Sequence, residues 1–533
     1  MSTYFSNDKK SIPPIYDVKI CEQTGFLMGG KIHEWSGPTE SVYSTVSIEN
    51  PESGRYLGKY PLMNSEHSLK VLEAAEKAWD HGRGKWPTMN VDERINCVKN
   101  FAKDMVKNKN QIRNMLMWEI AKSAPDAEKE FNRTVEYISL TIDALKDLDR
   151  NSSRLIHEQS IFAQVRRAPL GITLCMGPYN YPLNETFTTL IPSLITGNII
   201  IFKPPKKGVL LHKPLLQLFA RHFPEGTVNT IYGDGREVVT PLMKSGKIDV
   251  LAFIGSSKVA DILKSLHPDP HRLRSVLGLE AKNAAIIMDD ANLQNAVNEC
   301  ISGSLSYNGQ RCTALKIIFV HRNIFDNFME LFISGVEKLK KGLPWEDDVK
   351  ITPMPDPADA QRITEIISDA VDKGAQIANP SGGKSQGTLL FPTVVTNINS
   401  SMRIAYEEQF GPVVPVLPFT EISEPVKYII DSPYGQQASI FGKNPEKIGK
   451  LIDPLVNQVC RLNINSQCQR GPDTLPFTGR KDSAEGTLSI TDALRVFTIR
   501  TLVAAKDSSE NSELLKSILH EHYSSFLNTD YIF

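Results

Sequence analysis

The sequence predicts an α/β protein with largely parallel sheets, because short apolar runs alternate with segments of helical periodicity from Gly171 onward. Uninterrupted apolar runs are typical of strands buried on both faces, and their alternation with helices is typical of parallel sheets. In the first half of this region, strands are predicted over residues 171–176, 198–203, 228–232 and 249–254. A second sheet system is predicted from strands over residues 284–288, 315–320, 413–419, 438–441 and 459–463.

The chain before this region is predicted to be mainly helical. Its first forty or so residues show no clear period, and we interpret them as an arm that lies over the body. The elements predicted after the arm are a strand over residues 41–48, helices over residues 66–86 and 128–149, and two helical stretches between residues 91 and 121. Arg133 lies off the apolar stripe of the last helix, so it is either solvated or free to reach a site.

Two features are predicted after the second sheet system. Residues 493–505 are rich in threonine and valine and are interpreted as one long strand. The tail that follows contains a helical stretch over residues 514–522.

Composition favours a small-molecule ligand. The 533 residues contain 60 Lys and Arg against 61 Asp and Glu, so no strong field attracts nucleic acid or an anionic membrane. The seven cysteines are scattered, odd in number and without metal-binding spacing, which indicates a reduced, intracellular protein. We find neither a signal peptide nor a bilayer-spanning run, and we expect a cytoplasmic protein without a metal site.

A short loop, Tyr307-Asn308-Gly309-Gln310-Arg311-Cys312-Thr313, contains the predicted nucleophile. A thiol attacks as the thiolate, and a guanidinium next to Cys312 would lower its pKa. The alternative is a buried structural cysteine, since free cysteine is among the most buried residue types. The run of polar and glycine residues before Cys312 argues against that alternative.

Three loops at predicted strand ends suit a dinucleotide, because ligands bind beyond the carboxyl ends of parallel strands. The loop of Lys203 and Lys206 is basic and lacks the acid that commonly holds the ribose of NAD, which favours the extra phosphate of NADP. Gly235 belongs to a glycine turn that allows close backbone approach. Gly255 and Ser256 open a helix whose N-H groups favour a pyrophosphate. Each of these loops alone would be interpreted as an ordinary turn. The prediction of a dinucleotide site depends on finding all three at successive strand ends.

Several stretches together carry a family resemblance: GPYNYPLNETF, NIIIFKPPKKG, FIGSSK, SYNGQRCTALK, EEQFGPVVPV and NSQCQRGPDTLPFTGRKDS. Through them the chain resembles the aldehyde dehydrogenase superfamily over residues 40 to 505, and most of all its non-phosphorylating, NADP-dependent glyceraldehyde-3-phosphate dehydrogenases. The resemblance implies a Rossmann-like parallel-sheet cofactor domain, an α/β catalytic domain and a small β bridging element that builds oligomers.

The implied organisation begins with an N-terminal arm and the first part of the cofactor domain. It continues with a bridging hairpin, the main cofactor domain, the catalytic domain, an oligomerisation strand and a C-terminal tail. In chain order these are residues 1–154, 155–168, 169–283, 284–486, 487–507 and 508–533.

The resemblance also assigns roles. Cys312 matches the nucleophile, and Asn180 matches the amide that stabilises the oxyanion together with the Cys312 backbone N-H. Lys203 and Lys206 match positions at the adenosine ribose and its phosphate, Ser256 matches the pyrophosphate contact, and Glu408 and Phe410 match the nicotinamide-ribose end. The residues that match those holding the substrate phosphate are Tyr181, Arg311, Arg470 and Arg133, and arginine suits this task through its planar fork.

One departure concerns the base that activates water. The family's E-L-G-G-K motif aligns with Gly278-Leu279-Glu280-Ala281-Lys282, so the usual base falls on Gly278. If both positions lay in a strand, Glu280 would face the same side about 6 to 7 Å away and could replace the base. The alternatives are a base from elsewhere in the chain or no efficient hydrolysis.

The resemblance implies irreversible oxidation of glyceraldehyde 3-phosphate to 3-phosphoglycerate with NADP or, alternatively, NAD. The expected protein is a glycolytic homodimer or homotetramer that needs no inorganic phosphate. One alternative is a dehydrogenase of another small anionic aldehyde or semialdehyde that transfers its acyl group to coenzyme A. Another is a catalytically slow relative that acts as a binding protein.

Overall fold

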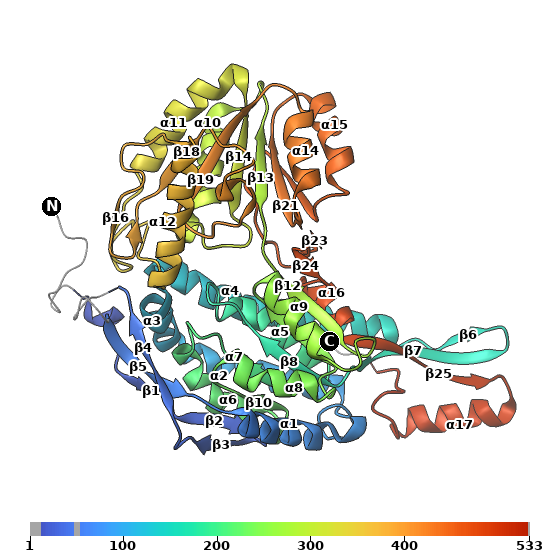
Figure 1. Ribbon diagram of the computed structural model, residues 1–533. Helices are drawn as coiled ribbons and strands as arrows, with labels where there is room; N and C mark the ends of the chain where they lie inside the picture. Colours follow the sequence, from blue (N-terminus) through green and yellow to red (C-terminus); the bar gives the residue numbers. More distant parts are fainter. Residues whose placement is uncertain (1–11, 47–53, 531–533) are drawn as a thin grey trace.

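The computed structural model describes residues 12–46 and 54–530, which form two sheet-centred bodies and a projecting arm (Figure 1). The lower body in Figure 1 contains a six-stranded sheet with the order β10-β9-β8-β11-β12-β24. Its strands are β8 (Ile172–Met176), β9 (Ile199–Lys203), β10 (Val228–Thr230), β11 (Val250–Ile254), β12 (Arg274–Gly278) and β24 (Ala484–Glu485). The pairs among β8 to β12 are parallel, and β24 pairs antiparallel with β12.

The helices of this body come partly from the chain before β8 and partly from the connections between its strands. α5 packs against β8 and β9 and, through another face, against α4. The helices of this part are α1 (Ser65–Trp79), α2 (Val91–Val106), α3 (Lys109–Ile120), α4 (Ala124–Ser152), α5 (Asn184–Ile195), α6 (Lys213–His222), α7 (Gly235–Val238), α8 (Thr240–Lys244) and α9 (Ser257–Leu266). The 3-10 turns are η2 (Pro14–Tyr16), η3 (Asp80–Gly82) and η4 (Leu210–His212). Every residue of α5 is buried, which makes it a rigid support for the loop before it.

The upper body contains a seven-stranded sheet with the order β15-β18-β19-β14-β13-β21-β22. Its strands are β13 (Asn283–Ile287), β14 (Leu315–His321), β15 (Gln376–Ile377), β18 (Thr393–Thr396), β19 (Val413–Phe419), β21 (Gln437–Phe441) and β22 (Arg461–Ile464). Its helices are η5 (Ser306–Gly309), η6 (Arg322–Ile324), α10 (Leu293–Leu305), α11 (Phe325–Glu337), α12 (Pro357–Asp372), α13 (Arg403–Tyr406), α14 (Ser423–Asp431) and α15 (Pro445–Leu455). Short strands complete it: β16 (Ser385–Gln386), β17 (Leu389–Leu390), β20 (Tyr434–Gly435) and β23 (Arg480–Lys481).

The first forty or so residues, predicted to be an arm without clear periodicity, contain more regular secondary structure than the sequence indicated. It contains β1 (Cys21–Glu22), β2 (Gly25–Met28), β3 (Lys31–Glu34) and β4 (Thr39–Ser44), followed by β5 (Arg55–Pro61). The backbone N-H of Leu27 donates to Thr230 Oγ1 at 2.8 Å, which joins β2 to β10. The predicted strand over residues 41–48 ends at Ser44 within the described residues, and its positions 47–48 lie outside them.

The projecting arm pairs β7 (Ile161–Pro169) with β6 (Ile156–Glu158) and with β25 (Thr498–Lys506). The predicted strand over residues 493–505 is wrong at its start, because Ile490–Val496 forms α16. Ile490, Ala493 and Leu494 have helical spacing and are fully buried against α4 and α5, so tertiary burial outweighed strand propensity. α17 (Ser509–His520) follows β25 along the arm.

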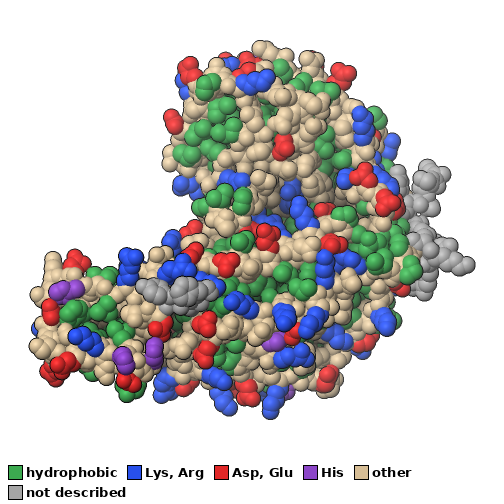
Figure 2. Space-filling model, turned by 180° about the vertical axis from the view of Figure 1, so that it is seen from behind, with side chains coloured by type: hydrophobic (Ala, Val, Ile, Leu, Met, Phe, Trp, Pro, Cys, Tyr) green, Lys and Arg blue, Asp and Glu red, His purple; other side chains and the backbone are tan. Residues whose placement is uncertain are grey.

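The surface seen from behind carries acidic and basic side chains in close mixture, without a large area of one sign (Figure 2). This distribution agrees with the formal net charge of −1. In the described part of the chain, no helix has the length and apolar character needed to cross a bilayer.

Candidate active site

A cavity of about 960 Å³ contains most of the predicted site residues. Strand-end loops of both sheets line it, including the loops after β11 and β12 and the loop before β14. The predicted residues in its lining are Arg133, Asn180, Tyr181, Lys206, Gly255, Ser256, Glu280, Arg311, Cys312, Glu408, Phe410 and Arg470. Lys203 ends β9 and Gly235 begins α7, and neither is part of this lining.

The loop that presents Cys312 has an unusual backbone. Tyr307, Asn308 and Gly309 have φ values of 50°, 56° and 71°, in the left-handed region that costs energy for side-chain residues. The Asn308 side chain compensates by donating to Thr352 O at 2.8 Å and accepting from Thr352 N-H at 3.0 Å. At Gly309 a Cβ would lie 2.7 Å from Gly411 O, so only glycine fits there.

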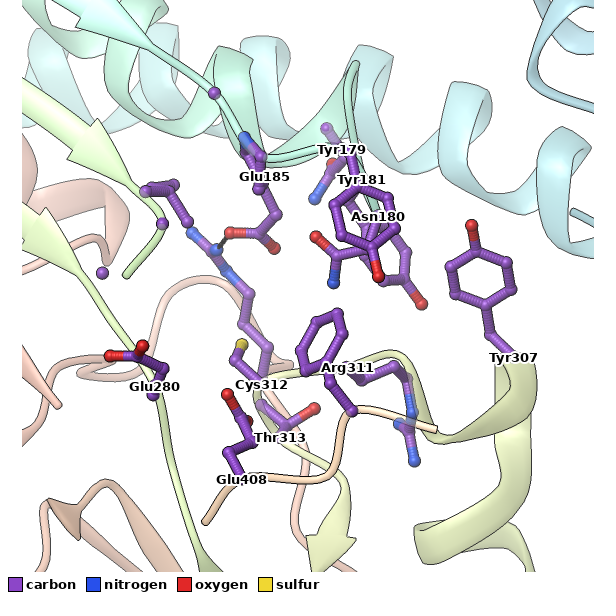
Figure 3. A pocket seen from close by; sticks show the side chains of 18 of the residues that line it. Tyr179, Asn180, Tyr181, Glu185, Glu280, Tyr307, Arg311, Cys312, Thr313 and Glu408 are labelled. Atoms are coloured by element: carbon purple, nitrogen blue, oxygen red, sulfur yellow. Dashed lines mark hydrogen bonds and ion pairs between the residues drawn. The ribbon is translucent and has the colours of Figure 1, made fainter. Parts of the chain in front are cut away.

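The electrostatic surroundings of Cys312 differ from the sequence prediction. Burial, with smaller contributions from the Glu185 and Glu408 carboxylates, raises the pKa of the thiol to about 11, and Arg470 opposes this. The neighbouring Arg311 side chain donates instead to the carbonyls of Ser302 and Gly303 at 3.2 and 2.8 Å. The prediction that Arg311 lowers the pKa of Cys312 is therefore wrong, since its guanidinium lies away from the sulfur (Figure 3).

This environment predicts a weakly reactive thiol in the free protein. With a pKa of about 11, the thiolate fraction of Cys312 at pH 7 is roughly 10⁻⁴. We expect the rate of Cys312 alkylation by iodoacetamide to rise roughly tenfold per pH unit from pH 7 to 10. The rate is measured by mass spectrometry of the Cys312 peptide, with Cys312→Ser as the background control. A rate that levels off near pH 8.5, as for an ordinary thiol, would contradict the prediction.

Asn180 lies beside the Cys312 loop, because its Nδ2 donates to Gln310 O at 2.7 Å. Within the described part of the chain, no acceptor takes the Cys312 backbone N-H. The backbone of Asn180 is itself anchored, since the fully buried Lys122 donates to Asn180 O at 2.9 Å. Lys122 also forms a buried ion pair with Glu130 and lies 3.4 Å from the ring centroid of Tyr181.

Apolar side chains lie where the family's base would be. A Cβ at Gly278 would lie 3.1 Å from Leu488 Cδ1 and 3.4 Å from Ile254 Cγ1. Because β12 ends at Gly278, the premise that Glu280 lies in the same strand is wrong. The Glu280 carboxylate accepts from the Ser257 backbone N-H at 2.8 Å, at the N-terminus of α9. For the Glu280 carboxylate to approach Cys312, this hydrogen bond would have to break. The role of Glu280 as the base stays a prediction.

Glu408 is a buried carboxylate that lines the cavity. Its Oε1 lies 3.6 Å from Lys316 Nζ and accepts no hydrogen bond from the described residues. Burial raises the pKa of Glu408 to about 7, with Lys316 opposing and Glu280 adding to the shift. Phe410 lies nearby, and its ring centroid is 4.6 Å from the same Lys316 nitrogen.

The predicted phosphate arginines already have acidic partners. Arg470 forms an ion pair with Glu185 and donates through Nε to Asp473 at 3.2 Å. Arg133 donates to both Asp473 oxygens, at 3.0 and 2.7 Å. Sequence reasoning missed Glu185 as a site residue, and its sequence signal is weak: a carboxylate in the GPYNYPLNETF stretch, five positions after Asn180.

The cofactor-side loops occupy the carboxyl edge of the lower sheet. Lys203 is the last residue of β9, and burial lowers its pKa to about 8. Lys206 forms an ion pair with Glu40 of β4 at 2.5 Å, so the lysine cluster is not unopposed. Ser256 caps α9. A cofactor phosphate would therefore compete with Glu40 for Lys206.

Comparison with known proteins agrees with this geometry. Residues 38–503 match the aldehyde dehydrogenase family. The chain belongs to this family. It is 32% identical over 471 residues to the NADP-dependent glyceraldehyde-3-phosphate dehydrogenase of Streptococcus equinus, covering 87% of this chain and 95% of the relative. The Pisum sativum enzyme of the same name is 30% identical over 478 residues, covering 88% and 93%.

The solved structures agree as well. The NADP complex of the NADP-dependent glyceraldehyde-3-phosphate dehydrogenase from Bacillus halodurans C-125 superposes with a TM-score of 0.84 at 31% identity. The superposition covers 91% of this chain and all of that one. The predicted α/β aldehyde dehydrogenase fold is confirmed.

Proposed function

We propose that this chain oxidises glyceraldehyde 3-phosphate to 3-phosphoglycerate with NADP. The main support is one cavity that contains Cys312 and Asn180 together with Tyr181, Arg311 and Arg470. The relatives that share about 30% identity over most of the chain are named for this activity and for NADP. Arginine forks suit a substrate phosphate, although Arg470 must share its donors with Glu185 and Asp473.

Residues from both bodies fit a dinucleotide. Glu408 Oε1 is a buried acceptor without a hydrogen-bond donor among the described residues, and a ribose hydroxyl would supply one. Lys203 and Lys206 would hold an adenosine ribose phosphate. The α9 N-terminus at Ser256 would hold the pyrophosphate, which would displace the Glu280 carboxylate from the Ser257 N-H. Gly255 and Phe410 line the cavity and Gly235 begins α7, and the three would complete the site. When bound, NADP supplies the acceptor for the hydride that leaves the substrate carbon; NAD would supply the same chemistry.

The protein's own groups account for bond formation. The Cys312 sulfur attacks the aldehyde carbon, and the carbonyl oxygen becomes an oxyanion. The Asn180 amide, which lies beside the Cys312 loop, and the Cys312 backbone N-H would donate to this oxyanion. After oxidation the acyl group is held as a Cys312 thioester, which must then be transferred to water.

We also propose a cytoplasmic location and a homodimer or homotetramer, and the arm supports the oligomer. Ile499 and Leu502 on β25 are 52% and 59% exposed, an apolar surface that a second copy would cover. The domain boundaries given above remain proposals.

The test of this function is NADPH formation from glyceraldehyde 3-phosphate in the absence of inorganic phosphate and coenzyme A. We expect continuous turnover with 3-phosphoglycerate as the product, and no NADPH with Cys312→Ser. Unphosphorylated glyceraldehyde is the matched substrate control, because it has the same reacting group without the phosphate. Equal kcat/KM values for the two aldehydes would contradict the proposed substrate.

A second candidate is transfer of the acyl group to coenzyme A, favoured by the apolar surroundings of Gly278. In that case NADPH formation would stop after one turnover and resume on addition of coenzyme A. The same experiment therefore separates the two functions. No NADPH under either condition would support a binding protein.

A further inference from the structure

The deacylation step lacks its usual carboxylate at Gly278, so another group must activate water if the thioester is to be hydrolysed. Two carboxylates influence the Cys312 thiol directly, those of Glu185 and Glu408, and both line its cavity. Glu280 also lines the cavity, but its carboxylate accepts from Ser257 at the end of α9. Figure 3 shows the Cys312 sulfur between Glu185 and Glu408, with Glu280 to one side.

Glu408 is less suitable than Glu185. Its Oε1 faces Lys316 and is the acceptor that fits a cofactor ribose. A group engaged with cofactor is not free to hold the attacking water.

Glu185 has the placement that a base requires. It lies in the first turn of α5, and its side chain is 10% exposed. One carboxylate oxygen, Oε2, pairs with Arg470. Its Oε1 accepts no hydrogen bond from the described residues, which leaves one oxygen for water. Among the charged groups, Glu185 has the largest effect in raising the pKa of Cys312, as a carboxylate close to the sulfur would.

Arg470 orients this carboxylate through the ion pair to its Oε2. Arg470 is itself fixed, because its Nη2 donates to Leu488 O at 3.1 Å and its Nε donates to Asp473. The ion pair is therefore part of a buried network on rigid elements.

We propose that Glu185 is the general base that activates the hydrolytic water in this chain. Glu185 takes a proton from water as the water oxygen bonds to the thioester carbon, giving a tetrahedral oxyanion stabilised by Asn180. Collapse breaks the carbon-sulfur bond, and the proton passes from Glu185 to the Cys312 sulfur. Thioester and water thus become carboxylic acid and thiol, and the acid ionises in solution. This role rests on the proposed function.

The test compares parent, Glu185→Gln and Glu280→Gln in rapid-mixing experiments with glyceraldehyde 3-phosphate and NADP. For Glu185→Gln we expect a stoichiometric NADPH burst, followed by a steady-state rate lower by about 10²- to 10⁴-fold. Intact-mass measurement should show the acyl group retained on the protein. Hydroxylamine, which attacks thioesters without a base, should restore turnover. Glu337→Gln is the matched control, because Glu337 lies outside the cavity and accepts from Asn379 Nδ2 at 2.7 Å.

A steady-state rate for Glu185→Gln within a few-fold of the parent would overturn the proposal and leave the proposed function standing. So would acyl-protein that accumulates in Glu280→Gln and not in Glu185→Gln. If Glu185→Gln shows no NADPH burst, the role of Glu185 is tested with Glu185→Ala and added formate. Restored thioester hydrolysis supports the base role, and unrestored hydrolysis rejects it. A parent without any burst rejects the proposed function and this role together.

Discussion

Replacing Asn180 with alanine should lower kcat by about 10²- to 10³-fold, the usual cost of removing one oxyanion donor. The Asn180 amide is fixed beside the Cys312 loop by its 2.7 Å bond to Gln310 O. Its loss removes a donor to the charge that develops on the substrate oxygen, both in thiol addition and in thioester hydrolysis. The measurement is the rate of the NADPH burst, which reports the first of these steps.

The matched control is Asn229→Ala. Asn229 is equally buried and also donates to a backbone carbonyl at 2.7 Å, but it lies in β10 outside the cavity. Both variants should lose comparable stability, and only Asn180→Ala should lose the burst rate. A burst rate for Asn180→Ala close to that of the control would remove Asn180 from the mechanism.

Replacing Lys122 with methionine should destabilise the protein by about 3–5 kcal/mol, because it leaves a buried carboxylate without its cation. Glu130 is 2% exposed, and its Oε1 also accepts from the N-H groups of Leu183 and Asn184 at 3.1 Å. Lys122 thus connects α4 to the start of α5 and to Asn180 O. Urea-induced unfolding measures the loss of stability.

The double variant Lys122→Met/Glu130→Leu separates the effect of an unpaired buried charge on stability from the effect of a lost anchor on catalysis. With both charges removed, we expect most of the stability to return, because well-packed apolar replacements of buried ion pairs are often neutral. Catalysis should be low in the single and the double variant, since Asn180 and Tyr181 would lack their anchor in both. If Lys122→Met unfolds at the same urea concentration as the parent, the pair contributes no net stability.

Periodicity and motif spacing were sufficient for much of the fold and part of the site. The apolar runs predicted both parallel sheets, because a strand covered on both faces has no polar alternation. The strand-end rule predicted a dinucleotide site from loops that include Lys206 and Ser256, and both residues line the cavity that also contains Cys312. The α16 segment was misassigned because its helical spacing covers only seven residues.

The sequence by itself determined the fold and the absence of a carboxylate at position 278, and it predicted Cys312 as the nucleophile. The tertiary structure alone decided which charges meet: Glu185 with Arg470, Glu280 with the end of α9, Lys206 with Glu40, and Arg311 with backbone carbonyls. Local patterns report which face of an element is buried. Pairing between residues hundreds of positions apart depends on how separate elements pack, and electrostatic effects depend on those distances and on burial.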